Sequence, residues 1–130
     1  MISKRTMLVS IAALSLVASL GIAAAQGVTI SSGMFEGASN HVTSGAATIV
    51  EDGGTYFVEL GEDFSLNNGP DPRVALGKDG YDPETQLGPL ASLTGAQRYE
   101  IPASIDVSNY NEVYIWCAAA DVPLGIAKLQ

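Results

Sequence analysis

The sequence predicts an all-β fold, a single antiparallel β-sandwich or barrel-like domain that follows an N-terminal signal peptide. Short apolar or alternating segments recur roughly every eight to twelve residues with turn residues between them, which is the spacing of small sandwiches and barrels. No segment after residue 26 keeps helical periodicity beyond two turns. Residues 113–118 are uncharged, with apolar side chains on both faces, which predicts a central strand covered on both sides.

The first 25 residues have the order of a secretory signal. Lys4 and Arg5 precede an uncharged run over residues 7–25 that ends in three alanines, and a basic start, an apolar middle and small residues before the cut define a signal peptide. The alternative is an uncleaved membrane anchor, although the run is near the lower length limit for a spanning helix. Cleavage would leave residues 26–130 as one exported domain, periplasmic or extracellular, with no membrane span of its own.

The first half of this domain contains strands separated by marked turns. The expected strands are residues 28–30, 33–37, 41–50, 55–60 and 73–76. Residues 55–60 alternate, so that Tyr56, Val58 and Leu60 share one face. The Glu51-Asp52-Gly53-Gly54 stretch predicts a hairpin turn because glycine accepts positive φ freely. Residues 64–72 are expected to turn, since they hold Asn-Gly and two prolines.

The second half continues the pattern to the end of the chain. The longest polar connection is residues 77–88. Short strands are expected at residues 90–93 and 97–101, and residues 102–111 form another turn region. After the central strand, residues 122–129 are expected to close the sheet.

Charge and cysteine content exclude several classes of function. Residues 26–130 keep four basic side chains against all 14 carboxylates, a formal charge of −10. This charge would repel a phosphate backbone, so nucleic acid is excluded as a partner. The single cysteine, Cys117, cannot form an internal disulfide. It is therefore a buried inert thiol, a link to another chain, or a reactive or ligating sulfur.

Metal and catalytic motifs are sparse. One Cys and one His cannot complete a structural zinc or blue-copper site. His41 is the sole candidate base near neutral pH, and no serine or carboxylate is marked as its partner in a hydrolase triad. Asp79, Asp82 and Glu84, with Asp71, are candidates for a calcium loop, although their spacing matches no EF-hand.

Six short blocks, taken in order, resemble the DM-thirteen domain, a family of bacterial exported proteins that also occurs beside DOMON domains in animals. The resemblance covers nearly all of the expected mature chain, and the Asn-Gly-Pro-Asp and Ile-Trp-Cys blocks contribute most to it. The blocks are Gly33-x-Phe35, His41-x-Thr43-Ser44-Gly45, Phe64-x-x-x-Asn68-Gly69-Pro70-Asp71, Gln97-x-Tyr99-x-Ile101-Pro102, Tyr110-x-x-Val113-x-Ile115-Trp116-Cys117 and Gly125-x-Ala127-x-Leu129.

The resemblance implies an electron-transfer module in which Cys117 acts as a bare thiol or holds a prosthetic group such as haem. In a haem site, Cys117 would be the axial ligand and His41 the second. Trp116 and Tyr114 would line the cofactor, although a regular strand points them away from Cys117. The partner would be a redox or cell-envelope protein. The competing hypothesis is a non-catalytic binding or adhesion module, in which Cys117 is core and the loops 67–72 and 77–88 make the contacts.

Overall fold

A computed structural model describes residues 27–130, and the expected signal peptide, residues 1–25, lies outside the described residues. The described chain holds ten strands and two single-turn 3₁₀ helices, with no α-helix. No helix in this part of the chain has the length and apolarity needed to span a membrane. The elements are β1 (Val28–Gly37), β2 (Thr43–Ser44), β3 (Ala46–Asp52), β4 (Thr55–Leu60), β5 (Ser65–Leu66), β6 (Pro72–Gly77), η2 (Pro83–Thr85), β7 (Gly88–Pro89), β8 (Gln97–Ile101), η3 (Val107–Asn109), β9 (Glu112–Cys117) and β10 (Val122–Lys128).

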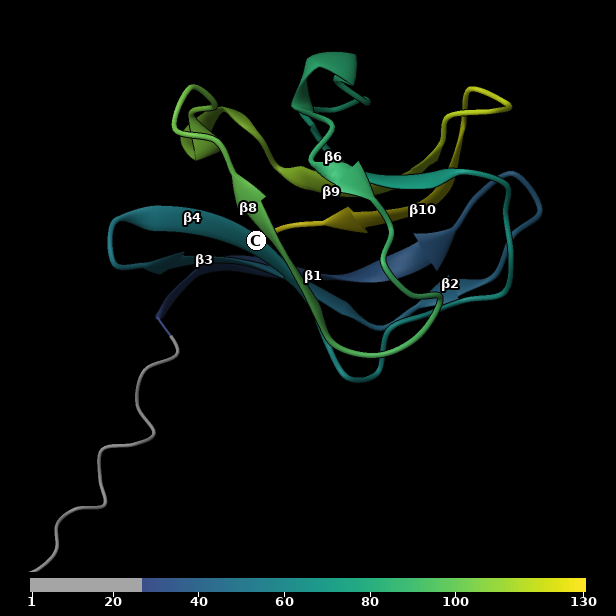
Figure 1. Ribbon diagram of the computed structural model, residues 1–130, viewed down its shortest axis with the longest axis horizontal. Coiled ribbons are helices and arrows are strands. Elements are labelled where there is room, and N and C mark those ends of the chain that lie inside the picture. The colour runs from purple at the N-terminus through teal and green to yellow at the C-terminus, as the bar shows by residue number, and fades with distance from the viewer. Residues whose placement is uncertain (1–26) are drawn as a thin grey trace, which may run out of the picture.

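Eight of these strands form one antiparallel sheet in the order β7-β6-β9-β10-β1-β3-β4-β8. The long strand β1 belongs to both halves of it: Val28 to Met34 pair with β3, and Phe35 to Gly37 pair with β10. The sheet therefore folds over at β1 and places β6, β9 and β10 above β3, β4 and β8, as Figure 1 shows. The result is a nearly closed barrel, which confirms the predicted all-β, barrel-like class.

The two edge strands of the sheet, β7 and β8, follow each other in the chain. Residues 90–96 join them, and within this segment the Ala91 N–H donates to the Tyr99 hydroxyl at 2.8 Å. The segment was expected to contain a strand at residues 90–93, and this prediction is wrong. The Ser92 hydroxyl instead donates to the Thr94 carbonyl, and the Gln97 amide donates to the Ser92 carbonyl. These local side-chain bonds stabilise a bend at residues 91–95, which takes the place of the main-chain hydrogen bonding of a β-strand.

Some of the predicted strand boundaries match the structure, and others differ because of a bulge or a glycine. Strands β4 and β8 match the prediction, as does the Gly53-Gly54 turn, where both glycines have positive φ. The expected strands at 28–30 and 33–37 are one continuous strand, with a bulge after Thr29. The expected strand at 41–50 is divided at Gly45, whose φ is +99° and whose Cα lies too close to Phe64 for any side chain.

The core lies between the two layers of the folded sheet. From β9, Val113, Ile115 and Cys117 point into it and are all essentially buried. Tyr114 and Trp116 occupy the outer face of the same strand, where Tyr81 from the long 77–88 connection packs on both rings. Strand β9 is therefore covered on both faces, as its apolar sequence predicts.

Candidate functional site around Cys117

Cys117 is the last residue of β9, at the end of the strand that leads into the β9–β10 turn. Its side chain is 1% exposed. The thiol Sγ donates to the Pro70 carbonyl oxygen at 2.9 Å and accepts the Ala120 N–H at 3.4 Å. The sulfur is thus buried at the end of the barrel, and both of its hydrogen-bond partners are main-chain groups of loops.

The loop that covers the sulfur, residues 67–71, is here termed the Pro70 loop. The Asn67 side-chain oxygen accepts the N–H groups of Val42 and Asn68, which fixes the start of the loop. At its other end the Asp71 carbonyl accepts the Ala118 N–H at 3.1 Å. Asp71 has a φ of +49°, which is uncommon for a residue with a side chain. The Pro70 loop is therefore anchored at both ends and passes directly over Cys117.

His41 lies beside the same loop. A Cβ built on Gly69 would lie 3.8 Å from the His41 Cε1 and 2.7 Å from the Leu124 Cδ1. The His41 Nδ1 is buried, and it has no hydrogen-bond partner among the described residues. The His41 ring thus lies near Gly69, and Cys117 contacts the next residue of the Pro70 loop, Pro70. These two predicted site residues come to one end of the barrel, separated by main chain.

Trp116 and Tyr114 do not join this group. They lie on the opposite face of β9, where the Tyr81 ring stacks on Trp116 with 3.6 Å between centroids and 8° between planes. Tyr114 meets both rings edge to face. The Trp116 indole N–H donates to the Asp121 carboxylate at 3.3 Å. The structure therefore places these rings on the far side of the strand from the sulfur, as strand alternation requires.

The outer face of β9 also holds a buried carboxylate. Glu112 accepts the Gly80 N–H at 2.8 Å and the Tyr114 hydroxyl at 3.1 Å. Burial, and then the bond to Glu112, raise the pKa of Tyr114 to about 12. These contacts hold residues 77–82 against β9, so that they cover the rings of Tyr114 and Trp116.

Three of the four candidate calcium ligands, Asp71, Asp79 and Asp82, have separate partners. Asp79 accepts the Asn111 amide at 3.1 Å. Asp82 caps η2 by accepting the Glu84 N–H, and its second oxygen accepts the Tyr110 hydroxyl at 2.8 Å. Asp71 forms an ion pair with Arg73 at 3.0 Å. Within residues 27–130, no three His, Cys, Asp or Glu side chains are grouped closely enough to hold a metal ion.

A haem ligated by Cys117 does not fit the described arrangement. The sulfur already contacts Pro70 and Ala120 at hydrogen-bond distance, and the side chain is almost fully covered. A porphyrin would need the space that the Pro70 loop occupies. Two cavities of the molecule are lined by other segments, one by residues 54–56, 100, 101, 103 and 105–108 and the other by residues 48, 59–62 and 96–98.

Sequence reasoning missed two residues that matter most to these surroundings. Pro70 was recognised as a turn former, and its carbonyl contact with Cys117 joins positions 47 residues apart. Tyr81 lies in a polar connection with no periodicity that marks its ring as the partner of Trp116. The Asn-Gly-Pro-Asp block was the signal in the sequence that could have identified Pro70. Residues of well-defined loops often take part in function.

The fold and these contacts define a small all-β domain with one buried thiol capped by a loop at the end of a nearly closed barrel. The family model described as Electron transfer DM13 matches residues 34–129. The chain belongs to this family, which is the DM-thirteen domain that its sequence blocks resemble. No curated protein and no solved structure matches the chain.

Proposed function

We propose that this chain is an exported electron-transfer domain in which Cys117 is the redox-active sulfur and the Pro70 loop controls access to it. Membership of a family described as electron transfer supports the general role. The observation that carries the assignment to Cys117 is the contact between its thiol and the Pro70 carbonyl. Both hydrogen-bond partners of the sulfur, Pro70 and Ala120, lie in loops at the end of the barrel, so local opening of these loops would expose it without unfolding the sheet.

The chemistry available to a lone thiol is exchange with a disulfide of another protein. On opening, the Cys117 thiolate attacks one sulfur of the partner's disulfide. A mixed disulfide forms, and the partner's second sulfur leaves as a thiolate that takes up a proton. Because the chain has one cysteine, release requires a further thiol to attack the mixed disulfide. The partner is thus a dithiol or disulfide protein of the same exported compartment.

Thiol labelling under native conditions tests this proposal. If the Pro70 loop opens locally, the free energy of opening measured from the labelling rate will be smaller than the free energy of global unfolding. The matched control is a second buried cysteine in the middle of the sheet, Val58→Cys in a Cys117→Ala background, because Val58 is fully buried on β4. That cysteine is expected to label only on global unfolding. Equal opening free energies at both positions would contradict the proposal.

The export part of the proposal has its own test. The mass of the protein purified from its native host is expected to correspond to a chain that begins at Gln26. A chain that retains residues 1–25 and fractionates with membranes would contradict cleavage and favour the anchor.

One observation favours a second function, a non-catalytic binding module. Cys117 is part of the core cluster, with 1% of its surface exposed, and a buried cysteine often acts as a small apolar side chain. In that case Cys117→Ala would keep every partner interaction of the protein. Loss of mixed-disulfide capture with retained folding would favour the redox role.

A further inference from the structure

Three dipeptides of the chain place Gly directly after Asn or Asp: Asp52-Gly53, Asn68-Gly69 and Asp79-Gly80. In such a pair the main-chain nitrogen of the glycine can attack the side-chain carbonyl carbon of the preceding residue, because glycine has no Cβ to obstruct the approach. Asparagine reacts more readily than aspartate, since an ionised carboxylate is a poor electrophile. The structure further distinguishes the three pairs by the contacts of their reacting groups.

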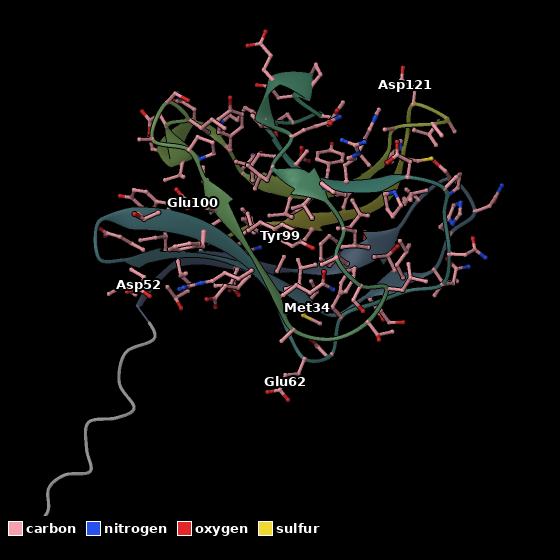
Figure 2. All side chains as sticks on the ribbon, in the orientation of Figure 1. Met34, Asp52, Glu62, Tyr99, Glu100 and Asp121 are labelled. Carbon is pink, nitrogen blue, oxygen red and sulfur yellow. The ribbon has the colours of Figure 1, made fainter. Side chains whose placement is uncertain are left out.

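The two Asp-Gly pairs have a reacting group engaged with a partner. Asp52, which Figure 2 labels near the β3–β4 turn, forms an ion pair with Arg98 at 3.1 Å. In the Asp79-Gly80 pair, the Gly80 N–H donates to the Glu112 carboxylate at 2.8 Å. A carboxylate or an N–H that is held by a partner has to lose that bond before it reacts. These two pairs are therefore restrained.

The Asn68-Gly69 pair has no such restraint. Asn68 is exposed, and among residues 27–130 neither its side chain nor the Gly69 N–H has a hydrogen-bond partner. The bonds that anchor the Pro70 loop are made by its first and last residues, Asn67 and Asp71. The Asn68 side-chain carbonyl and the Gly69 nitrogen can therefore approach each other without breaking a bond to the rest of the protein.

We propose that Asn68 is a site of spontaneous deamidation, and that the isoaspartate form of residue 68 loosens the cover over Cys117. The Gly69 nitrogen loses its proton to the solvent and bonds to the Asn68 side-chain carbonyl carbon. The bond from that carbon to the amide nitrogen breaks, so that ammonia leaves and a cyclic succinimide remains. Water then opens the ring. Opening at the side-chain carbonyl gives aspartate, and opening at the main-chain carbonyl gives isoaspartate, in which the main chain runs through the former side chain.

Isoaspartate would lengthen the main chain of the Pro70 loop by a methylene group and add a negative charge to it. Gly69 has little room to adjust, because a Cβ built on it would lie 2.7 Å from the Leu124 Cδ1. The added length is therefore passed to Pro70, whose carbonyl accepts the Cys117 thiol at 2.9 Å. This second step rests on the proposed role of the loop as a cover of the sulfur, and the deamidation itself does not.

Ageing of the purified protein at mildly alkaline pH tests the first step, because base removes the Gly69 proton. We expect peptide mass spectrometry to show replacement of the amide NH2 by OH at Asn68, and an isoaspartate-specific methyltransferase to methylate that peptide. Asn109 is the internal control. It is also exposed, but Tyr110 follows it, and the Tyr110 N–H donates to the Val107 carbonyl at 3.1 Å. Asn109 should keep its amide over the same period.

Thiol labelling under native conditions tests the second step. The isoaspartate form, separated from the parent by its charge, should label at Cys117 several-fold faster than fresh protein. Freshly prepared Asn68→Asp is the matched control, since it introduces the same charge without lengthening the main chain, and it should label at the parent rate. Asn68→Gln keeps an amide that closes a larger ring far more slowly, so its labelling rate should not change with age.

Three results would overturn the proposal. They are an intact amide at Asn68 after ageing, equal deamidation at Asn68 and Asn109, or equal labelling rates for the isoaspartate form and Asn68→Asp. If the isoaspartate form labels faster but captures no partner in a mixed disulfide, the inference stands and the redox role of Cys117 fails.

Discussion

The carbonyl oxygen of Pro70 accepts a hydrogen bond from the Cys117 thiol at 2.9 Å, so that a loop between β5 and β6 covers the last residue of β9. The cover depends on close packing of Gly69 against Leu124, which is fully buried. A methyl group on Gly69 would come 2.7 Å from the Leu124 side chain. Disturbing this contact should uncover the sulfur.

Gly69→Ala is therefore expected to lower the free energy of unfolding by about 1–3 kcal/mol and to speed native labelling of Cys117. Gly80→Ala is the matched control, because Gly80 also has a positive φ and an added Cβ there meets nothing within 4 Å. Gly80→Ala therefore introduces backbone strain at a positive φ without a steric clash of the added methyl group. Denaturant titration and labelling kinetics measure both effects. Similar labelling rates in the two variants would show that the Leu124 contact does not hold the loop closed.

A second prediction concerns Thr85, a fully buried polar residue of η2. Its hydroxyl accepts the Leu76 N–H at 2.9 Å, and its single proton is shared between the carbonyls of Leu76 at 2.9 Å and Asp82 at 2.7 Å. Thr85→Val keeps the shape and leaves the Leu76 N–H without a partner, which should cost about 1–3 kcal/mol. Thr94→Val, at an exposed position, should change the denaturation midpoint little. Equal midpoints for the two variants would contradict this role.

The stability of the fold should depend on pH in the alkaline range because of Tyr114, on the outer face of β9. Burial and the bond to Glu112 raise the pKa of Tyr114 to about 12 from a usual value of 10. Its stabilising contribution is present below pH 10 and is lost as the pH rises through about 12, since the folded state holds the proton more tightly. Absorbance titration of the phenolates should therefore show one step near pH 12 that disappears in Tyr114→Phe. Persistence of that step would assign it to another tyrosine.

The stack of Tyr81 on Trp116 has a direct spectroscopic test, because Trp116 is the one tryptophan of the sequence. Tyr81→Ala should shift Trp116 emission to longer wavelength, since water replaces the ring that lies 3.6 Å away. It should also destabilise the fold by about 0.5–1.5 kcal/mol beyond the loss of buried area. Tyr81→Phe keeps the ring and loses only the bond from Gln86, so its emission should match that of the parent. An unshifted spectrum in Tyr81→Ala would contradict the stack.

Much of the fold was predictable because it rests on local chemistry. The alternation of Tyr56, Val58 and Leu60 and the Gly53-Gly54 pair specify the β4 strand and its hairpin turn without reference to the rest of the chain. The failure at residues 90–93 is also local in origin. Leu90 and Leu93 look like strand residues, and the side chains of Ser92 and Gln97 close a bend instead.

The candidate site was less accessible to sequence reasoning. Cys117 and His41 could be identified by residue type alone. The position of Gly69 and Pro70 between them depends on the pairing of β6 with β9, which places Pro72 opposite Cys117, a residue 45 positions away in the sequence. Likewise, alternation along β9 excludes Trp116 from the sulfur's side, and nothing in the sequence of the 77–88 connection identifies Tyr81 as its cover.

Strand β1 hydrogen-bonds to both β3 and β10, and the latter pairing joins Phe35 to Ala127, close to the two limits of the described chain. The two halves of the barrel therefore cannot close until residues 122–128, which form β10, are available. A chain that emerges from a ribosome or a translocation channel N-terminus first would remain open, and competent for passage, until its C-terminal strand arrived. If the chain is exported as proposed, this late closure would keep the barrel open until passage is complete.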